Sequence, residues 1–149
     1  MPAAIEMPPE LVFGQLMDAY RAAVRAKDVD AFIALYDPEV RVFDLWGRWS
    51  YDGRDAWREM VAGWFGSLGE QRVEVAFDGV RTRSAPGLAV LHGYVEYRSI
   101  AADGSSPRAM HNRLAWTLVP AADGAGWRIV HEHTSAPADF ETAKVMLER

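Results

Sequence analysis

The sequence predicts an α+β domain in which one strongly curved, cone-shaped antiparallel (mixed) sheet wraps around three helices of the N-terminal half. Two observations favour this class. Apolar residues recur at three- and four-residue steps in three stretches before residue 69, and from residue 71 onward the repeat changes to two. Such a cone would cover every apolar face and leave a cavity between sheet and helices, where ligands commonly bind.

Three helices are expected, in this order. The first follows Pro8 and Pro9, and the second falls within residues 27–36, where Asp28 suits the N-cap and Asp37–Pro38 would end the helix. The third covers residues 52–68. Its apolar stripe, which favours core packing over a cofactor site, consists of Trp57, Met60, Val61, Trp64, Phe65 and Leu68.

The strands are expected around and after the third helix. Residues 39–51 hold one strand and a short second one, separated at Gly47. Four long strands follow within residues 71–84, 87–100, 108–119 and 126–136, joined as successive hairpins by turns rich in glycine. We expect a single domain over residues 1–149, with flexible ends at 1–8 and 139–149, although the last segment also has some helical potential.

Composition limits the partners and the chemistry. The net charge of −5 comes from 16 basic and 21 acidic residues without a block of like charge, so no nucleic-acid partner is expected. The absence of cysteine excludes disulfides, thiolate metal sites and a cysteine nucleophile. No apolar run approaches the roughly 20 residues that span a bilayer, so we expect no membrane association and a cytoplasmic protein.

The stretch "VRVFDLWGRW" raises the first functional question. Asp44 follows Val40 and Val42 on one face of a strand, so it is either a solvated strand end or an acid inside a pocket. Near tryptophan, its pKa would rise, which suits a general base. Tyr20 lies on the apolar stripe of the first helix, so it is either a core tyrosine or a residue whose hydroxyl lines a cavity.

The last two strands hold the other candidates. In "WRIVHEHTS", strict alternation puts Trp127, Ile129, His131, His133 and Ser135 on one face and the remaining residues on the other. Two histidines there could bind a metal only if a third ligand converged, and no carboxylate has matching spacing, so no metal site is predicted. Arg113, beside His111, is either a solvated edge residue or the anion-binding element of a pocket.

The run from Leu16 to Trp57 resembles the opening of the ketosteroid isomerases and, more broadly, of the SnoaL-like and nuclear transport factor 2-like superfamily. The matching positions are Leu16, Met17, Tyr20, Asp28, Tyr36, Asp37, Asp44, Gly53, Arg54 and Asp55. The resemblance implies that Tyr20 donates a hydrogen bond to a developing enolate. It also implies that Asp44 moves a proton between carbon atoms.

A second resemblance covers the end of the chain. "PRAMHNRLAW" and "GWRIVHEHTSAP" are similar to the association domain of calcium/calmodulin-dependent protein kinase. This similarity implies that Arg113, Glu132 and Thr134 face the cone, with His131 and His133 on the outer sheet surface. Ketosteroid isomerases also carry a second, protonated aspartate, whereas "HNRLAW" holds no carboxylate, so Arg113 is expected in its place.

Two functions are therefore predicted. The first is a cofactor-independent isomerase or related proton-transfer enzyme that acts on an apolar carbonyl compound with Asp44, Tyr20 and Arg113. The expected ligand-binding residues are Trp46, Trp64, Tyr97, His111, Glu132 and Thr134. The alternative is a non-catalytic ligand-binding or assembly domain that holds a small carboxylate through Arg113 with Glu132. An apolar outer sheet face containing Tyr94, Trp116, Trp127 and Ile129 predicts a homodimer.

Overall fold

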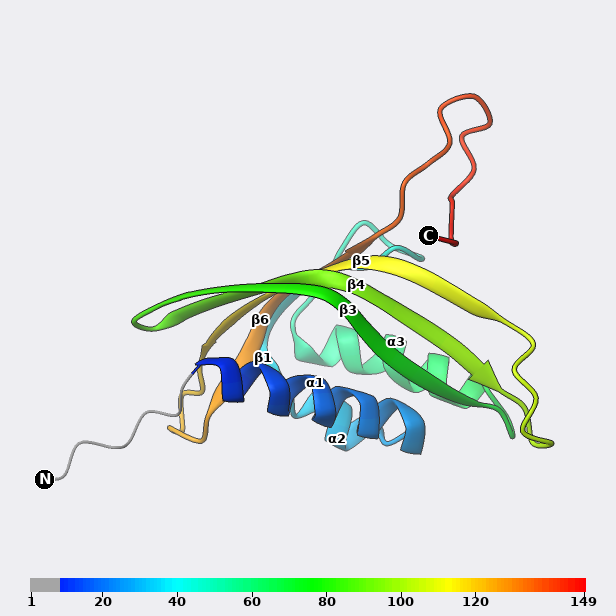
Figure 1. The fold of residues 1–149 in the computed structure, drawn as a ribbon. Coiled ribbons are helices and arrows are strands. Elements are labelled where there is room, and N and C mark those ends of the chain that lie inside the picture. Colours follow the sequence, from blue (N-terminus) through cyan, green and yellow to red (C-terminus); the bar gives the residue numbers. More distant parts are fainter. Residues whose placement is uncertain (1–8) are drawn as a thin grey trace, which may run out of the picture.

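The computed structural model describes residues 9–149 and has the predicted α+β architecture. The elements are α1 (Pro9–Ala26), α2 (Val29–Ile33), β1 (Tyr36–Phe43), β2 (Tyr51–Asp52), α3 (Arg54–Ser67), β3 (Arg72–Ala85), β4 (Leu88–Ile100), β5 (Ala109–Pro120) and β6 (Trp127–Ser135). Figure 1 shows the curved sheet with all three helices on one side of it. The predicted flexible segment 1–8 lies outside the described residues.

The six strands form one mixed sheet in the order β2-β1-β6-β5-β4-β3. Every neighbouring pair is antiparallel except β1 and β6, which run parallel. The parallel pair joins the first strand of the chain to the last one. Residues that are about 90 positions apart in sequence therefore become neighbours, as Val42 and Glu132 do in the register of this pair.

The second helix is shorter than the sequence pattern predicted. Asp28 is its N-cap, and the Asp28 carboxylate accepts a hydrogen bond from the backbone N–H of Ala31 at 3.0 Å. The helix ends at Ile33, so Tyr36 begins β1 instead of completing a helical face. Its ring still enters the core, where it is fully buried.

The core lies between the helices and the inner face of the sheet, and aromatic rings fill much of it. The ring centroid of Tyr20 lies 4.9 Å from that of Phe32, 5.5 Å from that of Trp116 and 5.7 Å from that of Phe77. Aromatic pairs at such separations add stability beyond the area they bury. The helix α1 thus holds its tyrosine in a rigid apolar surrounding.

A β-bulge decides which residues of β6 face the core. Register along β5 and β6 shifts between Thr117 and Leu118, which pair with His131 and Ile129 and leave Val130 as the extra residue. Ile129, Glu132 and Thr134 are consequently all buried. The strict alternation expected from the sequence is wrong for this strand, because the extra residue moves His131 and His133 to the face opposite Ile129.

The chain beyond β6 leaves the sheet on the side away from the helices and then turns back (Figure 1). It forms no helix over residues 139–149: Ala138 pairs with Val145 in an isolated bridge, and the backbone N–H of His111 donates to the carbonyl of Leu147 at 2.7 Å. The Arg149 guanidinium lies 3.9 Å from the ring centroid of Tyr94 and pairs with Asp78. Side-chain contacts therefore attach this tail to the outer face of the sheet.

None of the described helices is long and apolar enough to cross a membrane.

Candidate functional site

Asp44 lies directly after β1, at the rim of the cone, and Thr134 of β6 holds its carboxylate. The Thr134 hydroxyl accepts a hydrogen bond from the backbone N–H of Leu45 at 3.0 Å and donates to Asp44 Oδ1 at 3.0 Å. The backbone N–H of Trp46 donates to Asp44 Oδ2 at 3.1 Å. The parallel pairing of β1 and β6 thus fixes both position and orientation of this carboxylate.

The pKa of Asp44 is raised by burial, although the hydrogen bonds from Thr134 and from the backbone N–H of Trp46 act in the opposite direction. A raised pKa makes a carboxylate a stronger proton acceptor, which is the property that a general base needs. Asp44 also lines a groove of about 620 Å³ together with the loop that follows it and His133. The carboxylate can therefore be reached from outside the domain.

Glu132 of β6 provides a second carboxyl group on the inner face of the sheet, the face that Thr134 also shares. Its side chain is 2% exposed, and its Oε1 accepts hydrogen bonds from Tyr36 Oη at 2.7 Å and from Trp116 Nε1 at 2.8 Å. Burial raises the pKa of Glu132 to about 7, with a further contribution from the charge of Asp44. The surroundings of Glu132 therefore favour the neutral form of its carboxyl group.

Two tyrosine hydroxyls form the third part of the site. Tyr20 Oη lies 2.7 Å from Tyr97 Oη, and burial raises the pKa of both phenols. The charge of Asp44 raises the pKa of Tyr97 and that of Glu132, so all three groups lie within electrostatic range of one another. When one hydroxyl of the pair donates to the other, the second keeps its proton for a further acceptor.

The sequence-predicted residues fall into two groups. The structure brings together Asp44, Tyr20, Tyr97, Glu132 and Thr134 on the inner side of the sheet. Trp64 joins them as packing: its ring centroid lies 6.0 Å from that of Tyr97. Trp46 does not wall the carboxylate, because its side chain is 49% exposed in the loop after β1.

Arg113 and His111 lie on the outer face, contrary to prediction. Leu114 and Trp116 are buried on the inner face of β5, so strand alternation points residues 111 and 113 away from the cone. Arg113 Nε donates to Ser135 Oγ at 3.0 Å. Arg113 therefore cannot meet Glu132 across one cavity, and it does not occupy the place of a second acid in the cone.

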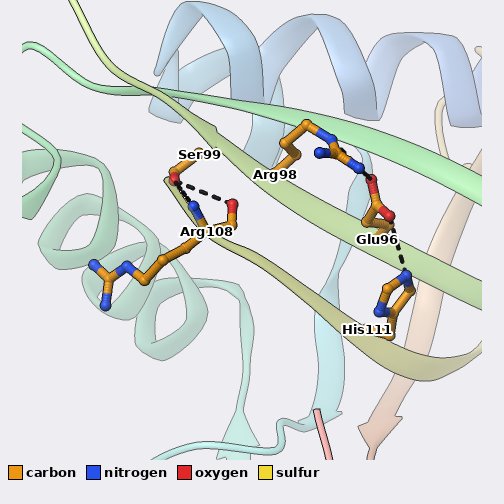
Figure 2. A network of polar contacts seen from close by, with 5 residues as sticks. All are labelled: Glu96, Arg98, Ser99, Arg108 and His111. Atoms are coloured by element: carbon orange, nitrogen blue, oxygen red, sulfur yellow. Dashed lines mark hydrogen bonds and ion pairs between the residues drawn. The ribbon is translucent and has the colours of Figure 1, made fainter. Parts of the chain in front are cut away.

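His111 belongs instead to a polar network on the outer surface. Figure 2 shows Glu96 between the side chains of His111 and Arg98: His111 Nε2 lies 3.0 Å from Glu96 Oε2, and Arg98 donates to Glu96 Oε1. Ser99 and Arg108 are linked nearby, near the hairpin between β4 and β5 (Figure 2). These contacts join β4 to β5 and hold the His111 side chain on the outer surface, away from the interior of the cone.

An outer hollow of about 680 Å³ lies over β3 to β6, on the face opposite the helices. Its lining includes Arg81, His92, Arg113 and His133. Arg81, His92 and His133 follow one another across the sheet, since Arg81 is opposite His92, His92 opposite Ala115, and Ala115 opposite His133. The residues that line it include two arginines and no carboxylate, so its lining is positively charged although the chain has a net charge of −5.

The same placement corrects the predicted outer apolar face. Trp116 is 1% exposed and Ile129 is fully buried, so both belong to the core. Tyr94, at 40% exposed, does lie on the outer face. The outer face of the sheet therefore exposes fewer large apolar side chains than the sequence predicted.

Comparison with known proteins agrees with this geometry. The SnoaL-like domain model matches residues 14–139. This chain belongs to the SnoaL-like domain family. Its similarity to solved structures extends the assignment to the nuclear transport factor 2-like fold, and no match was found among curated proteins.

Three solved structures illustrate the breadth of this SnoaL-like fold. A nuclear transport factor 2-like protein of unknown function from Pseudomonas putida is 26% identical, covers 94% of each chain and superposes with a TM-score of 0.79. A nuclear transport factor 2-like superfamily protein from Salmonella enterica is 17% identical over 93% of this chain and 100% of its own, with a TM-score of 0.69. A candidate calcium/calmodulin dependent protein kinase II association domain from Xanthomonas campestris is 16% identical over 91% and 92%, with a TM-score of 0.73.

Proposed function

We propose that this SnoaL-like protein binds a small apolar carbonyl compound and moves a proton on it without a cofactor. The observation that carries the proposal is the accessible carboxylate of Asp44, held by Thr134 within electrostatic range of a protonatable Glu132 and the Tyr20–Tyr97 pair. Proton abstraction next to a carbonyl needs a base for the C–H proton and hydrogen-bond donors for the enolate oxygen. This site offers both.

In this mechanism Asp44 takes a proton from the carbon next to the carbonyl. The electron pair of the C–H bond forms a carbon–carbon double bond, and the π pair of the carbonyl group moves onto the oxygen. The free hydroxyl of the Tyr20–Tyr97 pair donates a hydrogen bond to that oxygen. Protonated Asp44 then returns the proton to the same carbon or, where the enolate is conjugated with a further carbon–carbon double bond, to the far end of that bond. Glu132 in its neutral form adds no second negative charge near the developing enolate, where such a charge would raise the barrier.

Exchange of the α-proton with solvent deuterium tests this proposal without knowledge of the natural substrate. We would follow 1-tetralone in deuterium oxide by proton NMR, with the wild type, Asp44→Asn and Asp37→Asn. Asp37 is the matched control, since it lies in β1, which Asp44 directly follows, accepts one backbone N–H at 2.9 Å and keeps that acceptor as asparagine.

The wild type and Asp37→Asn should accelerate exchange equally, and Asp44→Asn should reduce the acceleration by at least about a hundredfold, within the range of general-base contributions. Asp44→Asn should still bind 1-tetralone, as measured by quenching of tryptophan fluorescence. Equal exchange by all three proteins would disprove the role of Asp44.

A second candidate function rests on the outer hollow. We propose as the alternative that Arg113 holds a small carboxylate there, together with Arg81, and without the participation of Glu132. The support is the gathering of two arginines and two histidines around one concavity whose lining includes no carboxylate. Arg113→Ala should then weaken benzoate binding, measured by calorimetry, whereas Asp44→Asn should leave it unchanged.

We also propose that two copies associate through the outer sheet face. Tyr94 and Leu88 of β4 are exposed there at 40% and 46%. The tail that lies on the same side exposes Val145 and Met146 at 42% and 45%. Apolar side chains gathered on one side of a domain favour burial against a partner.

A further inference from the structure

Asn112 of β5 is a buried polar residue that the proposed reaction does not use. Its side chain is 5% exposed, and it shares the inner face of β5 with Leu114, Trp116 and Leu118, all of which are buried. It is the only asparagine in the sequence. A carboxamide in an apolar wall is unusual, because buried polar groups almost always have hydrogen-bond partners.

No described residue provides such a partner. The carbonyl oxygen Oδ1 of Asn112 is fully buried, and within residues 9–149 it accepts no hydrogen bond. An unpaired buried carbonyl loses its hydration and gains nothing in return, which lowers the stability of the fold. One use for such a group is to accept a hydrogen bond from a ligand that the free protein does not contain.

The position of Asn112 in the sheet indicates that use. Asn112 is opposite Val95, so Tyr97 is its diagonal neighbour on β4, at the roughly 7–8 Å separation of such pairs. On the other side, Thr134 is opposite Leu114, the next inner-face residue along β5. Asn112 thus lies between the tyrosine pair and the Thr134–Asp44 pair.

We propose that Asn112 recognises a hydroxyl group on the ligand, so that the ligand is a hydroxylated small carbonyl compound. A hydroxyl suits this residue because it donates to a carbonyl oxygen and can equally accept from the amide N–H₂. This inference rests on the proposed function, since it places the ligand between Asp44 and Tyr97. Asn112 is then a third polar contact to the ligand, after Asp44 and Tyr97. This contact distinguishes carbonyl compounds of similar size by whether they carry a hydroxyl group.

Binding of matched ligands tests the inference independently of catalysis. The probes are 1-tetralone and its ring-hydroxylated isomers, with dissociation constants measured by tryptophan fluorescence quenching. For wild type, at least one hydroxylated isomer should bind about tenfold more tightly than 1-tetralone, the effect of one hydrogen bond to an otherwise unpaired group. Asn112→Ala should abolish this gain and leave the dissociation constant of 1-tetralone within about threefold.

Thr117→Val is the control, because residue 117 lies on the outer face of the same strand and is distant from the cone interior. This variant should keep the full gain. If the gain survives in Asn112→Ala, or if wild type binds no hydroxylated isomer more tightly than 1-tetralone, the inference is wrong. Failure of the proton-transfer proposal would appear separately, as binding without deuterium exchange.

A stability measurement distinguishes recognition from a structural role. Asn112→Leu keeps the branched shape of the side chain and removes the unpaired carbonyl, so the melting temperature without ligand should rise by about 2–5 °C. The same variant should lose the preference for the hydroxylated ligand. A lower melting temperature would show that the carboxamide supports the fold, and this result would overturn the inference.

Discussion

Replacing Glu132 with glutamine should remove a pH-dependent cost of folding. Glutamine has the same shape and still offers Oε1 to Tyr36 and Trp116, which contact that atom at 2.7 and 2.8 Å. It cannot ionise. Any pH dependence that the wild type shows and the variant lacks therefore reports the ionisation of the Glu132 carboxyl.

The size of the effect follows from the pKa. Burial in the fold moves the pKa of Glu132 from 4.5 to about 7, so the folded protein favours the neutral form. The stability contributed by the neutral carboxyl is fully present below pH 4.5 and is lost as pH rises through about 7. An interval of about 2.5 pH units at about 1.36 kcal/mol per unit corresponds to a loss of about 3 kcal/mol.

Urea denaturation of both proteins between pH 4 and pH 8.5 measures this loss. The free energies of unfolding should be similar at pH 4, and Glu132→Gln should be more stable than wild type by about 3 kcal/mol above pH 8. Glu74→Gln is the control, because Glu74 is exposed and its pairing with Arg25 contributes little. Parallel curves for wild type and Glu132→Gln would refute the argument that this carboxyl is desolvated.

Three further results are expected. Thr134→Val removes a hydrogen bond that lowers the pKa of Asp44, so the acidic limb of the pH profile for deuterium exchange should move to higher pH, whereas Thr134→Ser should leave it in place. An unmoved limb in Thr134→Val would contradict the assignment. Gly79→Ala should lower the free energy of unfolding by about 1 kcal/mol or more, since Gly79 has φ +59° and an added Cβ would lie 3.1 Å from the Tyr94 ring. Gly14→Ala in α1, where nothing lies within 4 Å of an added Cβ, should raise it by up to about 1 kcal/mol, and equal effects of the two substitutions in chemical denaturation would count against this reasoning. Light scattering should give twice the chain mass of 16.6 kDa, and a monomer mass at micromolar concentration would exclude the dimer.

Hydrophobic periodicity was sufficient to predict the order of helices and strands, because each element buries one face. Asp44 was also recognisable, since its position after Val40 and Val42 follows directly from alternation within β1. Trp46 illustrates the limit of that reasoning. It follows Asp44 by two residues, but the strand has already ended, and in a loop the alternation no longer controls where a side chain points.

Two features of the candidate site needed three-dimensional information. Arg113 was placed in the cone by resemblance, whereas the burial of Leu114 and Trp116 puts it outside. Asn112, its neighbour, was overlooked although it shares the alternation of Leu114, Trp116 and Leu118, a signal that the sequence does contain. The bulge at Val130 has no such signal, because neither glycine nor proline marks it.

The parallel pairing of β1 with β6 has a consequence for synthesis of the protein. The hydrogen bond between Asp44 and Thr134 joins residues 90 positions apart, and that between Tyr36 and Glu132 joins residues 96 apart. During translation, the helices and β1 leave the ribosome long before the strand that completes the site. A chain stopped before β6 would hold Asp44 and Tyr36 without their partners Thr134 and Glu132, so the candidate site is complete only when the last strand has inserted, and contacts of this sequence separation form slowly.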